Sequence, residues 1–544
     1  MRTSTASSLT NDQGNDQQQQ GENLKTRHSP RRSTRLWTLV AAIVLTLAVP
    51  GMCEAADPVR RLFLDDYHIQ SMTGLSRVYH QPVKHPAPVI MADQPWEMGP
   101  IYGRFLNVIN GIEWSPTLGR YRMWYNAGDY RRPCYAESAD GLTWTKPVLN
   151  LSGTNSDGSG SKSNNIIDLG YAPKDPATTS DANDEQSLVI IRDDLDPDTN
   201  RRYKAVVLRE PERTMRLLFS FDGLRWTWSG NTLFTNSDCY RLLHDTLTGR
   251  YVFFGKVVDG DGHRNVTMAT SVDFKTWSAN PLYFEADATD QTLGNTRKAR
   301  WLSDTNRVQP TYINEQAWTD IYNMPAFIYE GLYLALPCID DWTGSSPTKT
   351  QDGVIYPELM ASRDLAGPWN RLDRSPFINV SMKNSTNLYD QGMILSAQPV
   401  RVGDELWFYY TGYVHTHAQF QSHGTDYLRS AIHLAKLRLD GFASLHAGNT
   451  AGEVVTKSLP VNGKSLFVNA NAQAGTLKAE LLDAATGEVI PRYTLANSVA
   501  LQTDAVRARL QWQGVADLSA LAGRSVKIRF SVQNADLYSF WFGQ

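Results

Sequence analysis

The segment AESADGLTW at residues 136–144 joins a short strand to a tight turn and then to a tryptophan. The same order of Ser-x-Asp followed by Trp recurs in FSFDGLRW at 219–226, ATSVDFKTW at 269–277 and ASRDLAGPW at 361–369. Ser, Asp and Gly are typical of tight turns, and a large aromatic after the turn packs against the sheet. Four such copies, tens of residues apart, predict repeated antiparallel units of the kind that build a β-propeller, which binds its ligand at the central funnel.

Strand-like segments rich in aromatic residues follow turn residues at five places: 121–125, 203–208, 251–254, 332–336 and 406–410. Five such units predict an all-β fold with a five-bladed β-propeller over residues 57–445. After about residue 448 tryptophan becomes rare and short alternating strands follow one another between Gly, Asp and Asn turns. This pattern predicts a β-sandwich over residues 450–544.

Charge and cysteine usage limit the kind of partner. The net charge is −3 over 544 residues, with acidic and basic residues mixed along the chain. The chain therefore lacks the basic surface that nucleic acids require, and we expect no nucleic-acid partner. Beyond the amino-terminal segment, Cys134, Cys239 and Cys338 are too widely spaced for a metal cluster or a disulfide framework. We expect buried thiols, with a single disulfide as the alternative.

Residues 1–56 have the composition of a targeting segment. A Gln-rich stretch, predicted to be disordered, precedes several arginines, the apolar run 36–49 and a small-residue end near Ala56. This order predicts a signal peptide cleaved near Ala56, and hence a secreted or periplasmic protein. An uncleaved membrane anchor is the alternative, and we expect no other contact with a membrane.

Three short motifs carry a resemblance to a known family. The segment LNVINGI at 106–112, the pair Arg192-Asp193 and the pair Asp238-Cys239 follow one another in the first three predicted blades. In this order they resemble the arabinanase/levansucrase/invertase superfamily, the five-bladed glycoside hydrolases related to families 32 and 43. The resemblance implies a glycoside hydrolase in which Asp193 stabilises the transition state and Asp238 is the general acid. It also implies a nucleophile at the position of Val108, where a valine cannot act.

Hydrolysis of a glycosidic bond needs two carboxyl groups, one protonated and one ionised. Asp65 or Asp66, a pair beside an aromatic residue, could supply the base in place of Val108, and Asp320 in the fourth predicted blade is a further catalytic candidate. A structural role for these aspartates in turns is the alternative. Whether the reaction retains or inverts configuration stays open.

Aromatic rings stack on sugar faces, and polar side chains bind sugar hydroxyls. The predicted substrate-binding residues are Trp96, Tyr102, Asn107, Trp124, Arg192, Tyr322, Asn323 and Asp390. No metal site is predicted, because His415, His417 and His423 lack acidic partners at a fixed spacing. No cofactor is indicated, and a central Ca²⁺ stays open. The expected partner is a carbohydrate. The main alternative is a propeller that binds glycan without cleaving it, and a lyase or sialidase-like enzyme is a further one.

Overall fold

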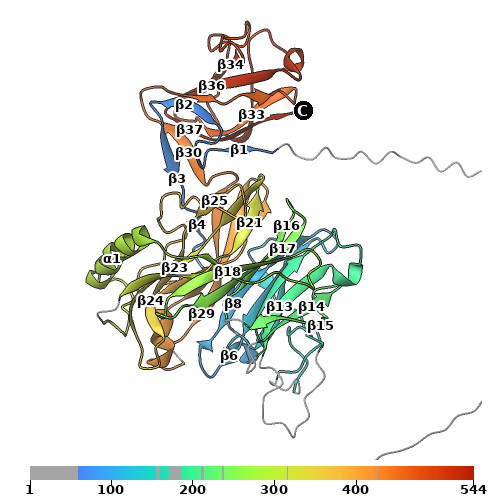
Figure 1. Ribbon diagram of the computed structural model, residues 1–544, viewed down its shortest axis with the longest axis vertical. Coiled ribbons are helices and arrows are strands. Elements are labelled where there is room, and N and C mark those ends of the chain that lie inside the picture. The colour runs from blue at the N-terminus through green and yellow to red at the C-terminus, as the bar shows by residue number, and fades with distance from the viewer. Residues whose placement is uncertain are drawn as a thin grey trace, which may run out of the picture. The chain divides into compact units, whose positions relative to one another are not determined.

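The structure is a computed structural model that describes residues 59–154, 160–170, 185–209, 214–235, 238–314, 317–425 and 427–544. The predicted signal segment, residues 1–56, lies outside the described residues. The described chain is nearly all β, as predicted, and contains one α-helix, α1 (Ala288–Ser303) (Figure 1). Within these ranges no helix has the length and apolar character needed to cross a membrane.

Three successive antiparallel sheets have four strands each, and each strand pairs with the next along the chain. The first sheet contains β8 (Leu106–Ser115), β9 (Arg120–Ala127), β10 (Arg132–Ser138) and β11 (Trp144–Thr145). The second contains β12 (Glu185–Arg192), β13 (Tyr203–Arg209), β14 (Thr214–Ser220) and β15 (Thr227–Thr235). The third contains β16 (Arg241–Asp245), β17 (Arg250–Val258), β18 (Arg264–Ser271) and β19 (Leu282–Phe284). The strands β8, β12 and β16 contact one another and are called the inner strands here, together with β21.

The strands that follow form two further groups. One contains β20 (Trp318–Asn323), β21 (Ala326–Tyr329), β22 (Leu332–Ala335), β23 (Cys338–Ser345), β24 (Gln351–Pro357) and β25 (Met360–Ser362). The other contains β26 (Met393–Ser396), β27 (Val400–Val402), β28 (Glu405–Tyr413) and β29 (Ser430–Arg438), and its outer edge is formed by β4 (Val83–Lys84) and β5 (Ile90–Met91). A parallel pair between Ile355 and Met393 joins the two groups. A small hairpin, β6 (Met98–Gly99) and β7 (Gly103–Arg104), precedes β8.

The Ser-x-Asp segments form the predicted turns. After β10, Ser138 Oγ accepts the amide of Gly141 at 2.8 Å, and Asp140 Oδ1 accepts the amides of Leu142 and Thr143, also at 2.8 Å. The turns at Ser220-x-Asp222 and Ser271-x-Asp273 repeat these bonds. The fourth copy differs, because Ser362 Oγ donates to the carbonyl of Pro368 at 3.0 Å.

Each of the first three turns also contacts a neighbouring sheet. The carbonyl of Gly223 accepts Trp124 Nε1 of β9 at 2.8 Å, and the carbonyl of Asp273 accepts Arg201 Nη2, just before β13, at 2.6 Å. The carbonyl of Gly141 accepts the Tyr409 hydroxyl of β28 at 2.7 Å. The first sheet is therefore bonded both to the second sheet and to the last group of strands.

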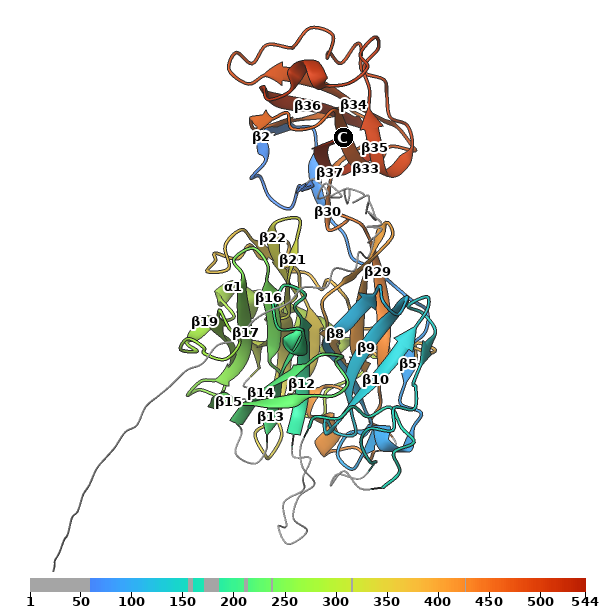
Figure 2. The same ribbon diagram turned by 90° about the vertical axis from the view of Figure 1, so that its right-hand side faces the viewer.

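Two further sheets contain the carboxyl-terminal strands. One has the order β3 (Ser76–Tyr79), β30 (Ala443–Ala447), β37 (Ala535–Gly543), β33 (Ser465–Asn471) and β35 (Asp504–Leu510), and β1 (Arg61–Leu62) also pairs with β37. The other has the order β2 (Ile69–Thr73), β31 (Gly452–Thr456), β36 (Ser525–Gln533) and β32 (Leu459–Pro460), and β34 (Thr476–Asp483) also pairs with β36. Blue amino-terminal strands lie among the orange and red ones (Figures 1 and 2).

This pairing differs from the predicted division at residues 445–450. Residues 61–79 form strands of the carboxyl-terminal sheets instead of belonging with the segment 57–445. The reason is apolar burial: Phe63 and Ile69 are buried in the same core as the carboxyl-terminal strands, and the ring of Phe63 stacks on Phe540 with centroids 5.6 Å apart.

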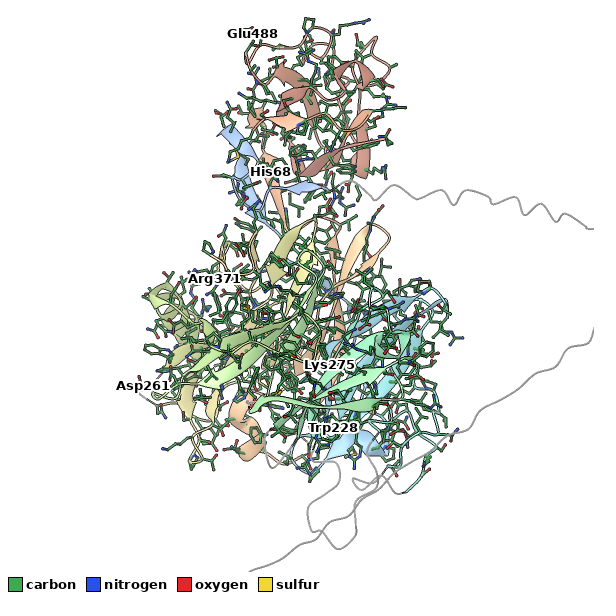
Figure 3. All side chains as sticks on the ribbon, turned by 45° about the vertical axis from the view of Figure 1, so that its right-hand side comes forward. His68, Trp228, Asp261, Lys275, Arg371 and Glu488 are labelled. Atoms are coloured by element: carbon green, nitrogen blue, oxygen red, sulfur yellow. The ribbon has the colours of Figure 1, made fainter. Side chains whose placement is uncertain are left out.

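Helix α1 lies between the third sheet and β20, and nothing in the predicted all-β pattern indicates it. Asp287 caps the helix by accepting the amides of Thr289 at 2.9 Å and Asp290 at 3.0 Å, and Asp290 accepts the amide of Asp287 in return. Asp290 is also bound through both oxygens by Arg371, which Figure 3 labels. Helices are predicted from apolar residues that recur every three to four positions. The buried residues of α1 are Asp290, Gly294 and Lys298, so the helix lacks this pattern.

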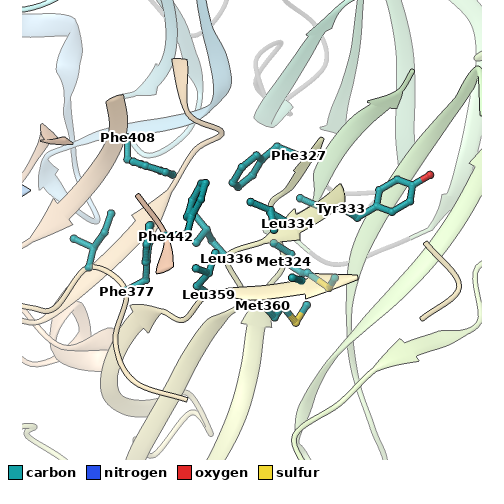
Figure 4. Packing of buried hydrophobic residues seen from close by; sticks show 14 of the residues in the cluster. Met324, Phe327, Tyr333, Leu334, Leu336, Leu359, Met360, Phe377, Phe408 and Phe442 are labelled. Atoms are coloured by element: carbon teal, nitrogen blue, oxygen red, sulfur yellow. The ribbon is translucent and has the colours of Figure 1, made fainter. Parts of the chain in front are cut away.

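The largest shared core lies between the later strands. Phe327 of β21, Phe408 of β28, Phe377 and Phe442 pack together there with Leu334, Leu336 and Met360 (Figure 4). Aromatic rings from separate strands thus fix the relative positions of the inner strand β21 and the strands around it.

Candidate functional site

A cavity of about 570 Å³ lies at the carboxyl ends of the inner strands. Its lining includes Glu113 of β8, Arg192 of β12, His244 of β16 and Glu330 after β21. Two predicted substrate-binding residues, Arg192 and Trp124, line it. Trp124 is otherwise buried between Tyr135 and Tyr203, so most of its ring packs between sheets.

The acids of this cavity are paired with cations and hydroxyls. Glu113 Oε1 accepts the Tyr203 hydroxyl at 2.7 Å, and its other oxygen lies 3.3 Å from Arg192. Glu330 accepts both the amide of Arg60, at 2.6 Å, and its guanidinium. Burial raises the pKa of Glu330, and the contacts with Arg60 act in the opposite direction. The sequence analysis missed both glutamates, because neither belongs to a motif.

Asp193 lies beside this cavity, immediately after β12. Its carboxylate accepts the Tyr251 hydroxyl at 2.5 Å and Lys204 Nζ at 2.9 Å, and His244 Nε2 is 3.7 Å away. Burial acts to raise the pKa of Asp193, but the hydrogen bonds from Tyr251 and Lys204 outweigh it and lower the pKa to about 2. Asp193 is thus an ionised, buried carboxylate with its own counter-ion.

Asp238 lies at the opposite end of β16, before its first residue. The strand has five residues at about 3.3 Å each, which places Asp193 and Asp238 on the order of 15 Å apart along it. The side chain of Asp238 is 46% exposed and forms an ion pair with Lys256 of β17. Lys256 Nζ in turn lies 4.6 Å from the centroid of the Tyr322 ring. The two predicted catalytic acids cannot therefore contact one glycosidic bond.

Aromatic residues surround Asp238, and three predicted residues gather with it. The Tyr322 hydroxyl bonds His417 Nε2 at 3.2 Å. Asn107 Nδ2 donates to the Tyr413 hydroxyl at 2.8 Å, within a cluster that also contains Tyr102. Burial raises the pKa of Tyr102, and the charge of Asp238 adds to this effect. Asp238, Tyr102, Asn107 and Tyr322 thus form one neighbourhood, which we call the Asp238 site.

A buried group of charges lies behind Tyr322. Asp320 of β20 is directly opposite Asp340 of β23, and both are almost completely buried. Arg264 donates its amide to Asp320 at 3.0 Å and its guanidinium to Asp340 at 2.9 Å, and it also lies over the Tyr322 ring. Burial raises the pKa of Asp320, and it raises that of Asp340 to about 7 against the effect of Arg264. Asp320 therefore faces Arg264 and not solvent.

Asn323 ends β20 one residue after Tyr322, and its side chain is buried at the inner end of the same neighbourhood. The other predicted residues lie elsewhere. Asp65 binds Arg363 and Asp66 binds Arg77. The two aspartates lie three and two residues before His68, which Figure 3 labels. Trp96 donates to Asn165 at 2.9 Å, and Asp390 binds Lys84 at 2.6 Å. The structure does not join these four residues to Asp238.

The position at which the sequence resemblance implies a nucleophile is part of the core. Val108 is fully buried, and its amide donates to Thr411 Oγ1 at 2.8 Å. Cys134, Cys239 and Cys338 are buried free thiols, as predicted. Among the described residues, no three His, Cys, Asp or Glu side chains are grouped to hold a metal ion.

Comparisons with solved structures give likenesses at low identity. An N-acetylgalactosamine deacetylase from F. plautii in complex with blood group B trisaccharide is 12% identical, with 68% of this chain and 96% of that one covered at a TM-score of 0.40. A thermostable family-43 glycoside hydrolase is 12% identical, with 64% and 96% covered at 0.38. An α-L-arabinofuranosidase from Podospora anserina in complex with cellotriose is 10% identical, with 66% and 98% covered at 0.38.

The last two of these structures are glycoside hydrolases. No protein-family model matches the chain, and no curated protein matches it.

Proposed function

We propose that this chain is an exported glycoside hydrolase whose five groups of strands form a five-bladed β-propeller, followed by a carboxyl-terminal β-sandwich. The hydrogen bonds from the first three repeated turns to neighbouring sheets, including the bond from Tyr409 of the last group to Gly141 of the first, support such a ring. The core shared by β33, β34, β36 and β37 supports the sandwich. The signal-like composition of residues 1–56 supports export.

The observation that carries the proposal is the Asp238 site. Of the five predicted catalytic acids, Asp238 combines solvent exposure with a position among aromatic rings at one end of the inner strands. The half-buried ring of Tyr102 offers a face or an edge to the C–H groups of a sugar, and the carboxylate of Asp238 can accept from its hydroxyls. This combination suits a glycan whose scissile bond lies beside a carboxyl group.

In this proposal Asp238 is the general acid: it transfers a proton to the leaving-group oxygen as the glycosidic bond breaks, and a water molecule from solvent bonds to the anomeric carbon and releases its proton to solvent. Asp320 and Asp340 act through Arg264, which they hold over Tyr322, and do not touch the substrate. Asp193 stabilises the second and third sheets instead of the transition state, since its carboxylate is bound by Lys204 and Tyr251. Asp65 or Asp66 as the base is not supported by their contacts with Arg363 and Arg77.

A glycan-binding protein without hydrolytic activity is the second candidate. It is favoured by Val108, which occupies the position of the family nucleophile and is buried in the core. Within the described ranges, Asp320 and Asp340, the acids that lie behind Tyr322, are also closed to substrate.

The test is a screen of the purified chain against a panel of polysaccharides, with released reducing sugar and bound glycan both measured. The hydrolase proposal expects release of a defined product, at least about 100-fold reduced in Asp238→Asn, as is typical for the loss of a general acid. Asp193→Asn serves as the matched control, which should keep cleaving at a temperature where it is folded. Binding without release by the wild type would support the second candidate instead.

A further inference from the structure

Arg241, the first residue of β16, is a charged side chain enclosed by the protein. It is 1% exposed, and its Nη1 donates to the carbonyl of Tyr240 at 2.9 Å. In the part of the chain that the structure describes, neither Nε nor Nη2 makes a hydrogen bond. A guanidinium carries a positive charge and five N–H donors, and it has no acceptor of its own. A buried charge without a partner is strongly destabilising.

The two unbonded groups lie on the same edge of the guanidinium plane. This edge binds a carboxylate through two parallel hydrogen bonds. Arg297 shows the arrangement in this protein, since its Nε donates to Asp341 Oδ2 at 2.7 Å and its Nη2 to Oδ1 at 3.1 Å. Arg241 presents the same pair of donors, but the nearby acids have other partners: Asp238 pairs with Lys256, and Asp340 with Arg264.

Among the described residues, two more buried polar side chains lack hydrogen-bond partners: Asn323, at both its amide atoms, and Ser396. Cys338 connects the three. Asn323 is opposite Cys338 in the pairing of β20 with β23. Burial raises the pKa of Cys338 to about 12, while the charge of Arg241 and a hydrogen bond from the Ser396 backbone act in the opposite direction. Three buried polar side chains from three strands therefore have Cys338 as a common neighbour, next to the Asp238 site.

We propose that Arg241 binds a carboxylate, or a planar oxyanion of the same size, through Nε and Nη2, and that Asn323 and Ser396 donate to the same ligand. Because Asp238 and Cys239 lie three and two residues before Arg241, the bound anion lies directly beneath the Asp238 site. Such a carboxylate has two sources: a small free anion, such as formate, or the carboxyl group of a uronic acid in the glycan. The second source rests on the proposed function, and the first does not.

Thermal unfolding of the whole purified chain, in a buffer free of small carboxylates, tests the proposal. Sodium formate, sodium D-galacturonate and sodium chloride are titrated at equal ionic strength. We expect formate to raise the unfolding temperature by several degrees more than chloride does, with saturation in the millimolar range. If galacturonate also raises the unfolding temperature, a uronic acid of the glycan can supply the bound carboxylate. Coincident curves for all three salts overturn the proposal.

Arg241→Met should abolish the response to formate. Arg225→Met, which removes the same charge from a side chain that is 65% exposed, should keep it. If Arg241→Met does not fold, a crystal structure of the wild type grown in formate decides the question. A planar ion on Nε and Nη2 supports the proposal, and ordered water alone at both atoms refutes it. If the protein responds to formate but cleaves no glycan, the hydrolase proposal is wrong and the proposal of an anion site at Arg241 is supported.

Discussion

At the residue scale, the two predicted catalytic aspartates Asp193 and Asp238 differ in how exposed they are beside their lysine counter-ions. Asp193 is 3% exposed and pairs with the fully buried Lys204, whereas Asp238 is 46% exposed although its partner, Lys256, is buried. The two-residue motifs were sufficient to find both acids in the sequence. They could not show that the acids lie at opposite ends of β16, because that depends on how many residues each strand contains.

Lys204→Met should destabilise the protein by about 3–5 kcal/mol, because it leaves a buried charge without its partner. Lys204 Nζ lies 2.9 Å from Asp193 and 2.9 Å from Asp196, and the lysine is inaccessible to solvent. Urea denaturation measures the change. Lys275→Met, an exposed lysine labelled in Figure 3, is the control and should stay within about 0.5 kcal/mol of the wild type.

The lowered pKa of Asp193 predicts that the protein loses stability in acid. Its pKa in the folded state, about 2, lies below the ordinary value of 3.8, so its contribution is present above pH 4 and is lost as the pH falls toward 2. Urea unfolding of the wild type and of Asp193→Asn across this range measures it. The difference between the two proteins should shrink on acidification, and a constant difference would contradict the account.

The raised pKa of Asp340 predicts the opposite dependence of stability on pH. Burial raises its folded-state pKa from 3.8 to about 7, so its stabilising contribution is complete below pH 4 and is lost as the pH rises through 7. Relative to Asp340→Asn, the wild type should therefore lose stability between pH 4 and 8. Thermal unfolding of both proteins at several pH values gives this difference. A difference that grows with pH would be inconsistent with the raised pKa.

At the element scale, the repeated turns could be predicted and the helix could not. Ser138 and Asp140 bond amides within a few residues, so their role can be read from a short segment. Helix α1 depends on Arg371, far along the chain, and on a cap whose residues also occur in turns. The buried charges were missed for a related reason, since Asp320 meets Asp340 only through the register of β20 and β23.

Gly223→Ala should cost about 1–3 kcal/mol, because it combines backbone strain with overpacking. Gly223 has a φ of +76°, and an added Cβ would lie 2.6 Å from Trp124 Cζ2. Gly249→Ala is the matched control: its φ is +70°, but nothing lies within 4 Å of the added Cβ. Chemical denaturation of both variants separates strain from overlap. Equal losses would show that the contact with Trp124 adds nothing.

At the scale of the whole molecule, the beginning of the described chain completes the sheets formed by its end. Ser76 pairs with His446 and Arg61 with Phe540, although hundreds of residues separate the partners. No local sequence pattern indicates such pairing. The sequence therefore predicts a domain boundary at residues 445–450 and does not assign β1, β2 and β3 to the carboxyl-terminal domain. The all-β class could be predicted from the sequence, because it follows from the local alternation of apolar and polar residues and from the turn residues between strands.

A chain that begins at residue 80 should lose protection of its carboxyl-terminal sheets. Without β1, β2 and β3, the strands β37, β31 and β30 lose their edge partners, and the core loses Phe63 and Ile69. Limited proteolysis with mass spectrometry should show early cleavage between residues 443 and 544. A chain that begins at residue 59 is the control and should resist. Equal resistance of the two chains would contradict the structural role of residues 61–79.

The location of the Asp238 site is tested most directly by a crystal structure of the Asp238→Asn variant with an oligosaccharide that the wild type binds or cleaves. The account predicts a sugar ring against Tyr102, with residue 238 within hydrogen-bond distance of one of the sugar oxygens. Oligosaccharide bound solely in the cavity lined by Glu113, Arg192 and Glu330, or on the carboxyl-terminal sheets, would contradict it.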